Sequence, residues 1–284
     1  MFEPYTYYAP TRLVVGRSAV REKVPGILAS EGSKGLIVTD HGLVQAGLVE
    51  QVTSALDSSS LAYAVYDGVK ENPPADTVHE CFDRYEAEGC DYLIAIGGGS
   101  SMDTAKCVGV LATHGGKVQD HFGLNTLKTR IPFLLCIATT YGTASEVTPF
   151  AVVTDDNFKA SIGDPNIIPH VGVLDSDMAV ALPMPIAAAT GMDALTHAIE
   201  SYVSLVSNPI SKGLALHAIR LISENLRQAA SSDSNHHATE QMLRQLQPGS
   251  AAEIGPAVTA SLELLRATPA AEVDQPSVIV VTAA

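Results

Sequence analysis

Three consecutive glycines (97–99) follow an apolar run that begins at Tyr92. Glycine lets the backbone turn tightly and approach a ligand closely, and the helix-like sequence after the turn presents free amides at its first turn. Ser100 is placed to cap that helix, with Asp103 three residues later. An anion such as a phosphate suits this position. The third glycine of the usual dinucleotide fingerprint falls on Met102, however, so spacing alone leaves phosphate binding and a purely structural turn equally open.

A second group with possible chemistry is the pair Asp193 and His197. Residues four apart share one face of a helix, and an oxygen beside an imidazole can hold a divalent transition metal. Two structural alternatives stay open at this stage. Asp193 is also a capping-box position after a Thr190 cap, and a lone histidine is often a hydrogen-bonded core residue.

The elements that must position these residues alternate between strand and helix patterns through the N-terminal half. This alternation predicts an α/β domain with a doubly wound, mostly parallel sheet. We expect strands at 11–16, 35–39, 61–66, 92–96, 132–137, 147–154 and 171–174, with helices at 19–29, at 75–88 and from Ser101. Lys159 falls on the connection between the last two strands.

Asp40 stands where the second predicted strand ends. Ligands of open α/β sheets bind at the carboxyl ends of the strands, where a carboxylate can accept hydrogen bonds from a ribose. The alternative, an N-cap for the helix starting near Gly42, carries similar weight.

The pattern becomes helical after Asp177, with segments expected at 187–203 and 211–226. We therefore predict two domains, residues 1–178 and residues 179–284, the second all-α. Of the later histidines, His217 is expected in the helix core, and His236 with His237 in a solvated loop.

Composition excludes several classes of partner. The formal net charge is −14, from 17 Lys and Arg against 31 Asp and Glu, which argues against nucleic acid or an anionic membrane surface. No stretch is long and apolar enough to cross a bilayer. The four cysteines form no Cys-x-x-Cys pair and no secretory leader is recognisable, so we expect a cytoplasmic protein with reduced cysteines and a small-molecule partner.

Five ordered blocks resemble the iron-containing (group III) alcohol dehydrogenases, particularly the branch with lactaldehyde reductases and propanediol dehydrogenases. The resemblance runs from about Val14 to about Arg227. The blocks are TDHGL at 39–43, DGV and NP within 67–73, GGGSSMDTAK at 97–106, TTYGTASEV at 139–147 and GMDALTHAIE at 191–200.

The resemblance implies an NAD-dependent alcohol dehydrogenase or aldehyde reductase, with a metal as Lewis acid and the active site between an α/β and a helical domain. It implies that Asp40 contacts the adenosine ribose and favours NAD over NADP. The remaining implied dinucleotide contacts are Gly98, Gly99 and Ser100 at the pyrophosphate, with Asn72, Thr139, Thr140 and Lys159 along the cleft. Asp193 and His197 would be two of four ligands to Fe(II), or to Zn. No general base is assigned.

The chain departs from the family pattern near its end. The two downstream ligand histidines of the family are not recognisable, and from about Arg244 the resemblance stops. We therefore expect an incomplete helical domain, an incomplete metal site and poor or no turnover. The alternatives are a catalytically inactive NAD-binding remnant, or a relative of the glycerol dehydrogenases and dehydroquinate synthases. A homodimer formed through the strand edge near Leu13 to Val15 is also expected.

Overall fold

A computed structural model describes residues 5–156, 158–180, 182–231 and 236–244. Its main feature is a six-stranded sheet in the order β1-β9-β6-β4-β2-β3, with every neighbouring pair parallel. The strands are β1 (Arg12–Val15), β2 (Lys34–Val38), β3 (Ala62–Tyr66), β4 (Tyr92–Gly97), β6 (Leu134–Ala138) and β9 (Val171–Leu174). The predicted parallel sheet is therefore confirmed.

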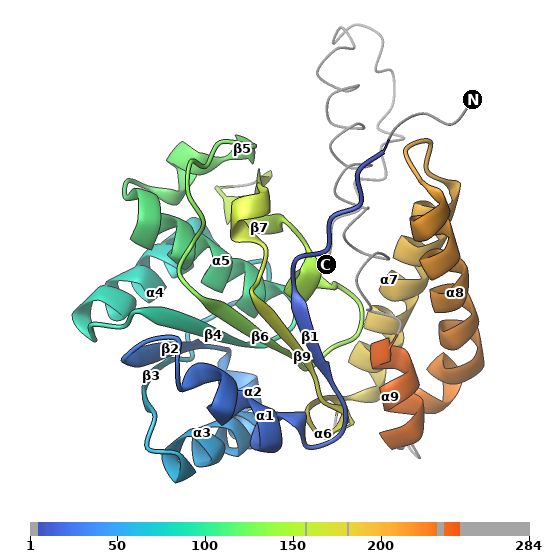
Figure 1. Ribbon diagram of the computed structural model, residues 1–284, viewed down its shortest axis with the longest axis horizontal. Coiled ribbons are helices and arrows are strands. Elements are labelled where there is room, and N and C mark those ends of the chain that lie inside the picture. The colour runs from blue at the N-terminus through green and yellow to red at the C-terminus, as the bar shows by residue number, and fades with distance from the viewer. Residues whose placement is uncertain (1–4, 157, 181, 232–235, 245–284) are drawn as a thin grey trace, which may run out of the picture.

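Helices cover both faces of this sheet (Figure 1). On one side lie α1 (Ala19–Leu28), α2 (His41–Gln45) and α3 (Leu48–Ser58), and on the other α4 (Ala75–Ala87) and α5 (Gly99–His114). Successive strand residues point to opposite faces, so Ile37 joins the core under α1 and α3 while Leu36 and Val38 join the core under α4 and α5. Because both faces are buried, the strands read as continuous apolar runs.

A second, smaller sheet was not predicted from the sequence. It has the order β5-β8-β7, formed by β5 (Gly123–Leu124), β7 (Phe150–Asp155) and β8 (Phe158–Gly163). The expected strand at 147–154 starts later, because Ser145–Val147 form a 3-10 turn, η2. Lys159 lies on β8, opposite Thr154 of the antiparallel β7, rather than on a connection. Two further 3-10 turns, η1 (Val118–His121) and η3 (Pro165–Ile167), complete this part.

The helical part comprises α6 (Ser176–Ala179), α7 (Met184–Val203), α8 (Pro209–Ala229) and α9 (His236–Arg244). Helices α7 and α8 pack closely, since a side-chain carbon on Gly191 would collide with Leu226. The expected core position of His217 is wrong: it is exposed, because α8 buries the face carrying Ala215, Ala218 and Ile222. Among the described residues, no helix is long and apolar enough to cross a membrane.

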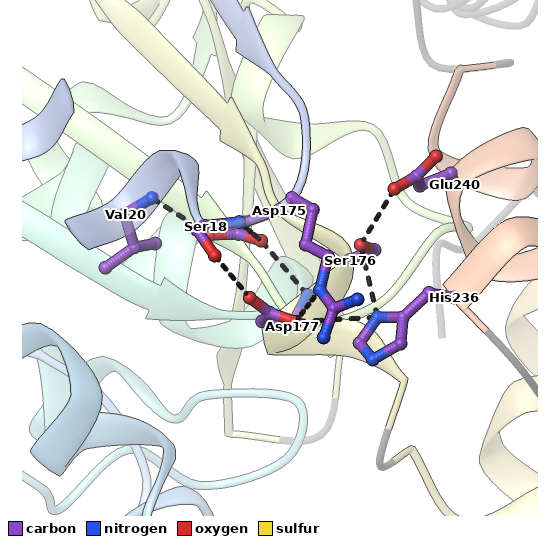
Figure 2. Close-up of polar contacts among 8 residues, drawn as sticks. Ser18, Val20, Asp175, Ser176, Asp177, His236 and Glu240 are labelled. Carbon is purple, nitrogen blue, oxygen red and sulfur yellow. Dashed lines mark hydrogen bonds and ion pairs between the residues drawn. The ribbon is translucent and has the colours of Figure 1, made fainter. Parts of the chain in front are cut away.

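Asp175, directly after β9, connects the start of the chain to the helical part (Figure 2). Its carboxylate accepts the backbone amides of Ser18 and Val20, both at 2.9 Å, and so caps the otherwise uncapped start of α1. It also accepts the amide of Asp177 at 3.0 Å and caps α6. One carboxylate therefore fixes two helices at the point where the α/β sequence pattern ends.

Helix α9 is held at the same point. The hydroxyl of Ser176 donates to Glu240 at 3.3 Å, and His236 Nδ1 lies 3.5 Å from Asp177 Oδ1 (Figure 2). The expectation that His236 and His237 lie in a solvated loop is wrong for the local structure, because both begin α9. His236 is half-buried and faces α6, whereas His237 is exposed.

Candidate functional site

The glycine turn lies at the topological switch point of the sheet. The chain runs outward from β2 to β3 and then returns to place β4 on the other side of β2, after which β6 continues away. Ligands of open α/β sheets bind at such a reversal, beyond the carboxyl ends of the strands. The ends of β2, β4 and β6 bring Asp40, the glycine turn, and Thr139 with Thr140 to this edge.

The turn forms a cradle at the start of α5, and two threonines lie close to its glycines. A side-chain carbon on Gly98 would lie 3.0 Å from Thr140 Oγ1, and one on Gly99 would lie 3.1 Å from Thr143 Cγ2. The helix starts at Gly99 with Gly98 as N-cap and with no side-chain cap. Ser100 is inside the first turn, so its expected capping role is wrong. The first-turn amides thus face the cradle with the positive end of the helix dipole.

Four of the predicted residues line one small pocket beside this cradle: Asn72, Gly99, Ser100 and Lys159. Asn72 adopts a left-handed backbone conformation (φ 50°), and its carbonyl accepts the hydroxyl of Thr154 at 3.0 Å. This bond holds the loop after β3 against β7. The pocket therefore brings together segments that are far apart in the sequence, with an exposed lysine at its edge.

Asp103 also lines this pocket, which the sequence interpretation missed. Its carboxylate does not cap α5 but accepts Ser145 Oγ at 2.7 Å and the amide of Val152 at 3.0 Å. Burial raises its pKa, and the nearby ammonium of Lys106 opposes that shift. The available signal was the spacing of Asp103 and Lys106, two charges three apart in an otherwise apolar helix.

Asp40 performs the structural role that was left open. It is the N-cap of α2, and its Oδ1 accepts the amide of Leu43 at 3.0 Å. It also sits at the end of β2, next to the strand that carries the glycine turn. The position of Asp40 is therefore compatible both with capping α2 and with binding a ribose.

The Asp193 and His197 side chains face each other on α7, with Nε2 and Oδ1 3.6 Å apart. The Thr190 cap interpretation is excluded, because α7 begins at Met184 and Thr190 donates to the carbonyl of Ile186 within the helix. Burial raises the pKa of Asp193, while His197 opposes that shift. A half-buried carboxylate beside a buried imidazole suits a cation.

The second nitrogen of His197 meets the loop that covers the glycine turn. Nδ1 lies 3.3 Å from the carbonyl oxygen of Gly142. A carbonyl can only accept, so this contact favours the tautomer with the proton on Nδ1, which leaves the Nε2 lone pair available to a metal ion beside Asp193. Metal-bound histidines commonly have this arrangement.

Asp193 and His197 would supply two of the four ligands that the family resemblance implies. Within 5–156, 158–180, 182–231 and 236–244, no group of three or more His, Cys, Asp or Glu side chains is close enough to hold a metal ion. His236 faces Ser176 and Asp177, and His217 is exposed, so neither joins Asp193 and His197.

Known proteins match this chain in two parts, the α/β part and the helical part. The sequence profile described as iron-containing alcohol dehydrogenase matches residues 10–176, and the profile of the C-terminal part of the Fe-containing alcohol dehydrogenase family matches residues 187–246. The NAD-dependent methanol dehydrogenase of Bacillus methanolicus is 38% identical over 83% of this chain and 62% of its own length. The lactaldehyde reductase of Escherichia coli K12 is 41% identical over 78% of this chain and 59% of its own.

Solved structures agree with these matches. A crystal structure of 1,3-propanediol oxidoreductase has a TM-score of 0.83 and 36% identity, covering 88% of this chain and 66% of that one. Sulfoacetaldehyde reductase from Bifidobacterium kashiwanohense, solved with NAD+, has a TM-score of 0.81 and 28% identity over 88% of this chain and 67% of that one.

The fold and site define a doubly wound α/β protein with a glycine turn at its switch point and a helical part in which Asp193 and His197 face each other. The chain belongs to the iron-containing alcohol dehydrogenase family, whose members compared here are oxidoreductases. It spans about three fifths of the length of the curated relatives it matches.

Proposed function

We propose that this chain is the NAD-binding and metal-ligating part of an NAD-dependent alcohol dehydrogenase or aldehyde reductase acting on small alcohols or aldehydes. The observation that carries this proposal is the loop at 139–145. Thr140 and Thr143 of this loop border the glycine cradle, and the carbonyl of Gly142 contacts His197. One loop therefore joins a dinucleotide cradle to a metal-ligand pair, as an active site between two domains requires.

The glycine cradle is the reason for proposing that a dinucleotide binds. In the proposal the pyrophosphate lies on Gly98, Gly99 and Ser100, where free amides and the helix dipole favour an anion. Asn72, Thr139, Thr140 and Lys159 provide polar groups along the same edge. The name of the Bacillus relative and the NAD+ bound in the sulfoacetaldehyde reductase support NAD as the cofactor.

Asp40 provides the selectivity for NAD. A ribose 2′-hydroxyl can donate to its carboxylate, whereas the 2′-phosphate of NADP would meet a like charge at the same place. The N-cap bond of Asp40 to Leu43 fixes the carboxylate at the strand end.

Asp193 and His197 would contribute a carboxylate oxygen and the Nε2 lone pair to Fe(II), or to Zn. A bound metal supplies Lewis acidity that stabilises a developing alkoxide during hydride transfer to nicotinamide. Gly142 sets the tautomer of His197. Durable catalytic sites generally use three or more protein ligands, so two ligands give weak binding and little turnover.

The incomplete ligand set favours one second candidate, a chain that binds NAD without turning over substrate. The deciding experiment measures iron content and NADH-linked alcohol oxidation on one purified sample, before and after anaerobic addition of ferrous iron. We expect NAD binding, weak iron uptake and poor activity. Stoichiometric iron with robust turnover would instead show that residues outside the described ranges complete the site.

A matched pair of variants shows whether the iron sits where we propose. His197→Gln should abolish the weak iron uptake, whereas His217→Gln, an exposed histidine on α8, should leave it unchanged. Equal uptake by both variants would contradict the assignment of His197.

We also propose two domains divided near residue 178, a cytoplasmic location and a homodimer. The division falls within α6. The four cysteines are free and buried, which suits a reducing compartment. Among the residues that the structure describes, no strand pairs with the outer side of β1, which offers a surface for a second copy.

A further inference from the structure

Lys106 is fully buried in the middle of α5 and has no role in the site described above. Its Nζ donates to Ser145 Oγ at 2.7 Å, to the carbonyl of Phe150 at 2.6 Å and to the carbonyl of Thr148 at 3.1 Å. A buried ammonium is costly unless it is fully hydrogen-bonded, and its acceptors lie on Ser145, the last residue of the loop at 139–145, and on the segment that follows it. The lysine therefore ties α5 to that segment.

Asp103, one turn earlier on α5, completes the network. Its Oδ1 accepts Ser145 Oγ and lies 4.0 Å from Lys106 Nζ, and its Oδ2 accepts the amide of Val152. Burial lowers the pKa of Lys106, and the carboxylate of Asp103 counteracts this. Ser145 is the central member, because it accepts from the lysine and donates to the aspartate.

The network bears on the position of the loop at 139–145. Ala144, the residue before Ser145, has a left-handed backbone (φ 51°) and is 3% exposed. Such a conformation of a non-glycine residue persists only where its surroundings enforce it. The bonds of Ser145 supply that enforcement, and the same loop holds Thr140 and Thr143 over the cradle and Gly142 against His197.

We propose that Lys106 is a positioning residue that, through Ser145 and Asp103, holds this loop in the geometry that both the dinucleotide cradle and the Gly142–His197 contact require. It touches neither the proposed cofactor nor the proposed metal site. The expected change in NAD affinity rests on the proposed function. The expected change at His197 is measured without any cofactor or metal and does not depend on it.

The test compares Ser145→Ala, which removes one hydroxyl, with Thr11→Val as control. Thr11 is also buried, and its hydroxyl donates to the carbonyl of Pro169 at 2.9 Å, between the segments that precede β1 and β9. Thr11→Val loses one buried hydrogen bond and Ser145→Ala loses two, so both variants should lose stability and Ser145→Ala should lose more. Lys106→Met serves as a second variant if it folds.

NAD affinity is measured by calorimetry, and the His197 tautomer by side-chain 15N shifts of metal-free protein at a pH where the ring is neutral.

We expect Ser145→Ala to weaken NAD binding by roughly five- to tenfold and to lower the fraction of His197 protonated at Nδ1, since a hydrogen bond contributes on the order of 1 kcal/mol. Thr11→Val should change neither. Unchanged affinity and tautomer in Ser145→Ala would overturn the proposal, and so would equal changes in both variants. If the unmodified chain binds no NAD, the proposed function fails, while the tautomer measurement alone still decides the role of the network.

Discussion

His197 Nδ1, on α7 of the helical part, lies 3.3 Å from the carbonyl oxygen of Gly142, in the loop that borders the glycine cradle of the α/β part. The two residues are 55 positions apart in sequence. This contact connects the two sets of residues that the sequence singled out separately. Substitutions on either side of it therefore have definite consequences.

Replacing Gly142 with alanine should open this contact. The added carbon would lie 2.5 Å from the carbonyl oxygen and 3.0 Å from Cα of Thr190, both backbone atoms that cannot move independently of α7. We expect Gly142→Ala to lower the free energy of unfolding by about 1–3 kcal/mol, as overpacking does. Urea denaturation measures this.

Gly213→Ala is the matched control, because a side-chain carbon there meets open space on α8. It should be neutral or stabilise by up to about 1 kcal/mol, since alanine favours helix. Equal stability of the two variants would mean that the loop does not pack on α7 as described.

Two substitutions separate the capping role of Asp40 from its proposed role in cofactor choice. Serine is as good an N-cap as aspartate but carries no charge, whereas alanine loses the cap at a cost of about 1 kcal/mol. Asp40→Ser should therefore keep its stability, and Asp40→Ala should not.

Both Asp40 variants should shift the ratio of NADP to NAD affinity toward NADP by roughly tenfold, because they remove a like charge worth on the order of 1–2 kcal/mol. Calorimetric titration with each dinucleotide provides the ratio. A ratio that stays at the wild-type value in both variants would exclude Asp40 from the ribose site.

Glu146 should make stability depend on pH. It is 1% exposed, and its Oε1 has no hydrogen-bond partner among the described residues. Burial raises its pKa from 4.5 to about 7, with the nearby Lys106 opposing the shift. The folded state then holds a proton that the unfolded state releases, so this contribution is fully present below pH 4.5 and is lost as pH rises through about 7.

Glu146→Gln should remove that dependence. We expect the variant to gain roughly 3 kcal/mol over the parent above pH 7, and little below pH 4.5. Chemical denaturation across this range measures both arms. A constant difference between the two proteins at all pH values would show that Glu146 does not titrate as described.

The dimer proposal depends on the outer edge of β1, where Val15 is 43% exposed. Val15→Lys should convert the dimer to monomer, because a charge on an edge strand opposes strand pairing. Phe158→Lys is the control, an exposed apolar residue on the small sheet. Light scattering after size exclusion measures the mass, and a dimer that survives Val15→Lys would place the interface elsewhere.

Much of the fold was predictable because local and global preferences agree. The apolar runs at β2, β4 and β6 are buried on both faces, and the glycines between β4 and α5 interrupt the pattern at one clear point. Asp193 and His197 are brought together by helical spacing alone, so their pairing did not depend on tertiary contacts.

The predictions from the sequence were wrong where tertiary packing determines the environment of a residue. From the sequence, Asp103 was placed three residues after a Ser100 cap and Lys106 was given no role. Every residue of α5 from Ser101 to Leu111 is buried, however, so both charges needed partners on a distant segment. The β7–β8 hairpin was missed although Asp155 and Asp156 are typical turn residues, and Asp156 has a left-handed backbone (φ 51°). His217 was misplaced because its apolar neighbours lie on the opposite face of α8.

The proposed function depends first on whether NAD binds at the glycine cradle. Calorimetric titration of NAD into the purified chain and into the Gly99→Val variant measures this binding. Valine at Gly99 would crowd Thr143, whose Cγ2 lies 3.1 Å from the position of its first side-chain carbon. We predict saturable binding of one NAD per chain that is lost in the variant. No binding to the parent chain, or equal binding to both proteins, would contradict the assignment of this fold to an NAD-dependent dehydrogenase.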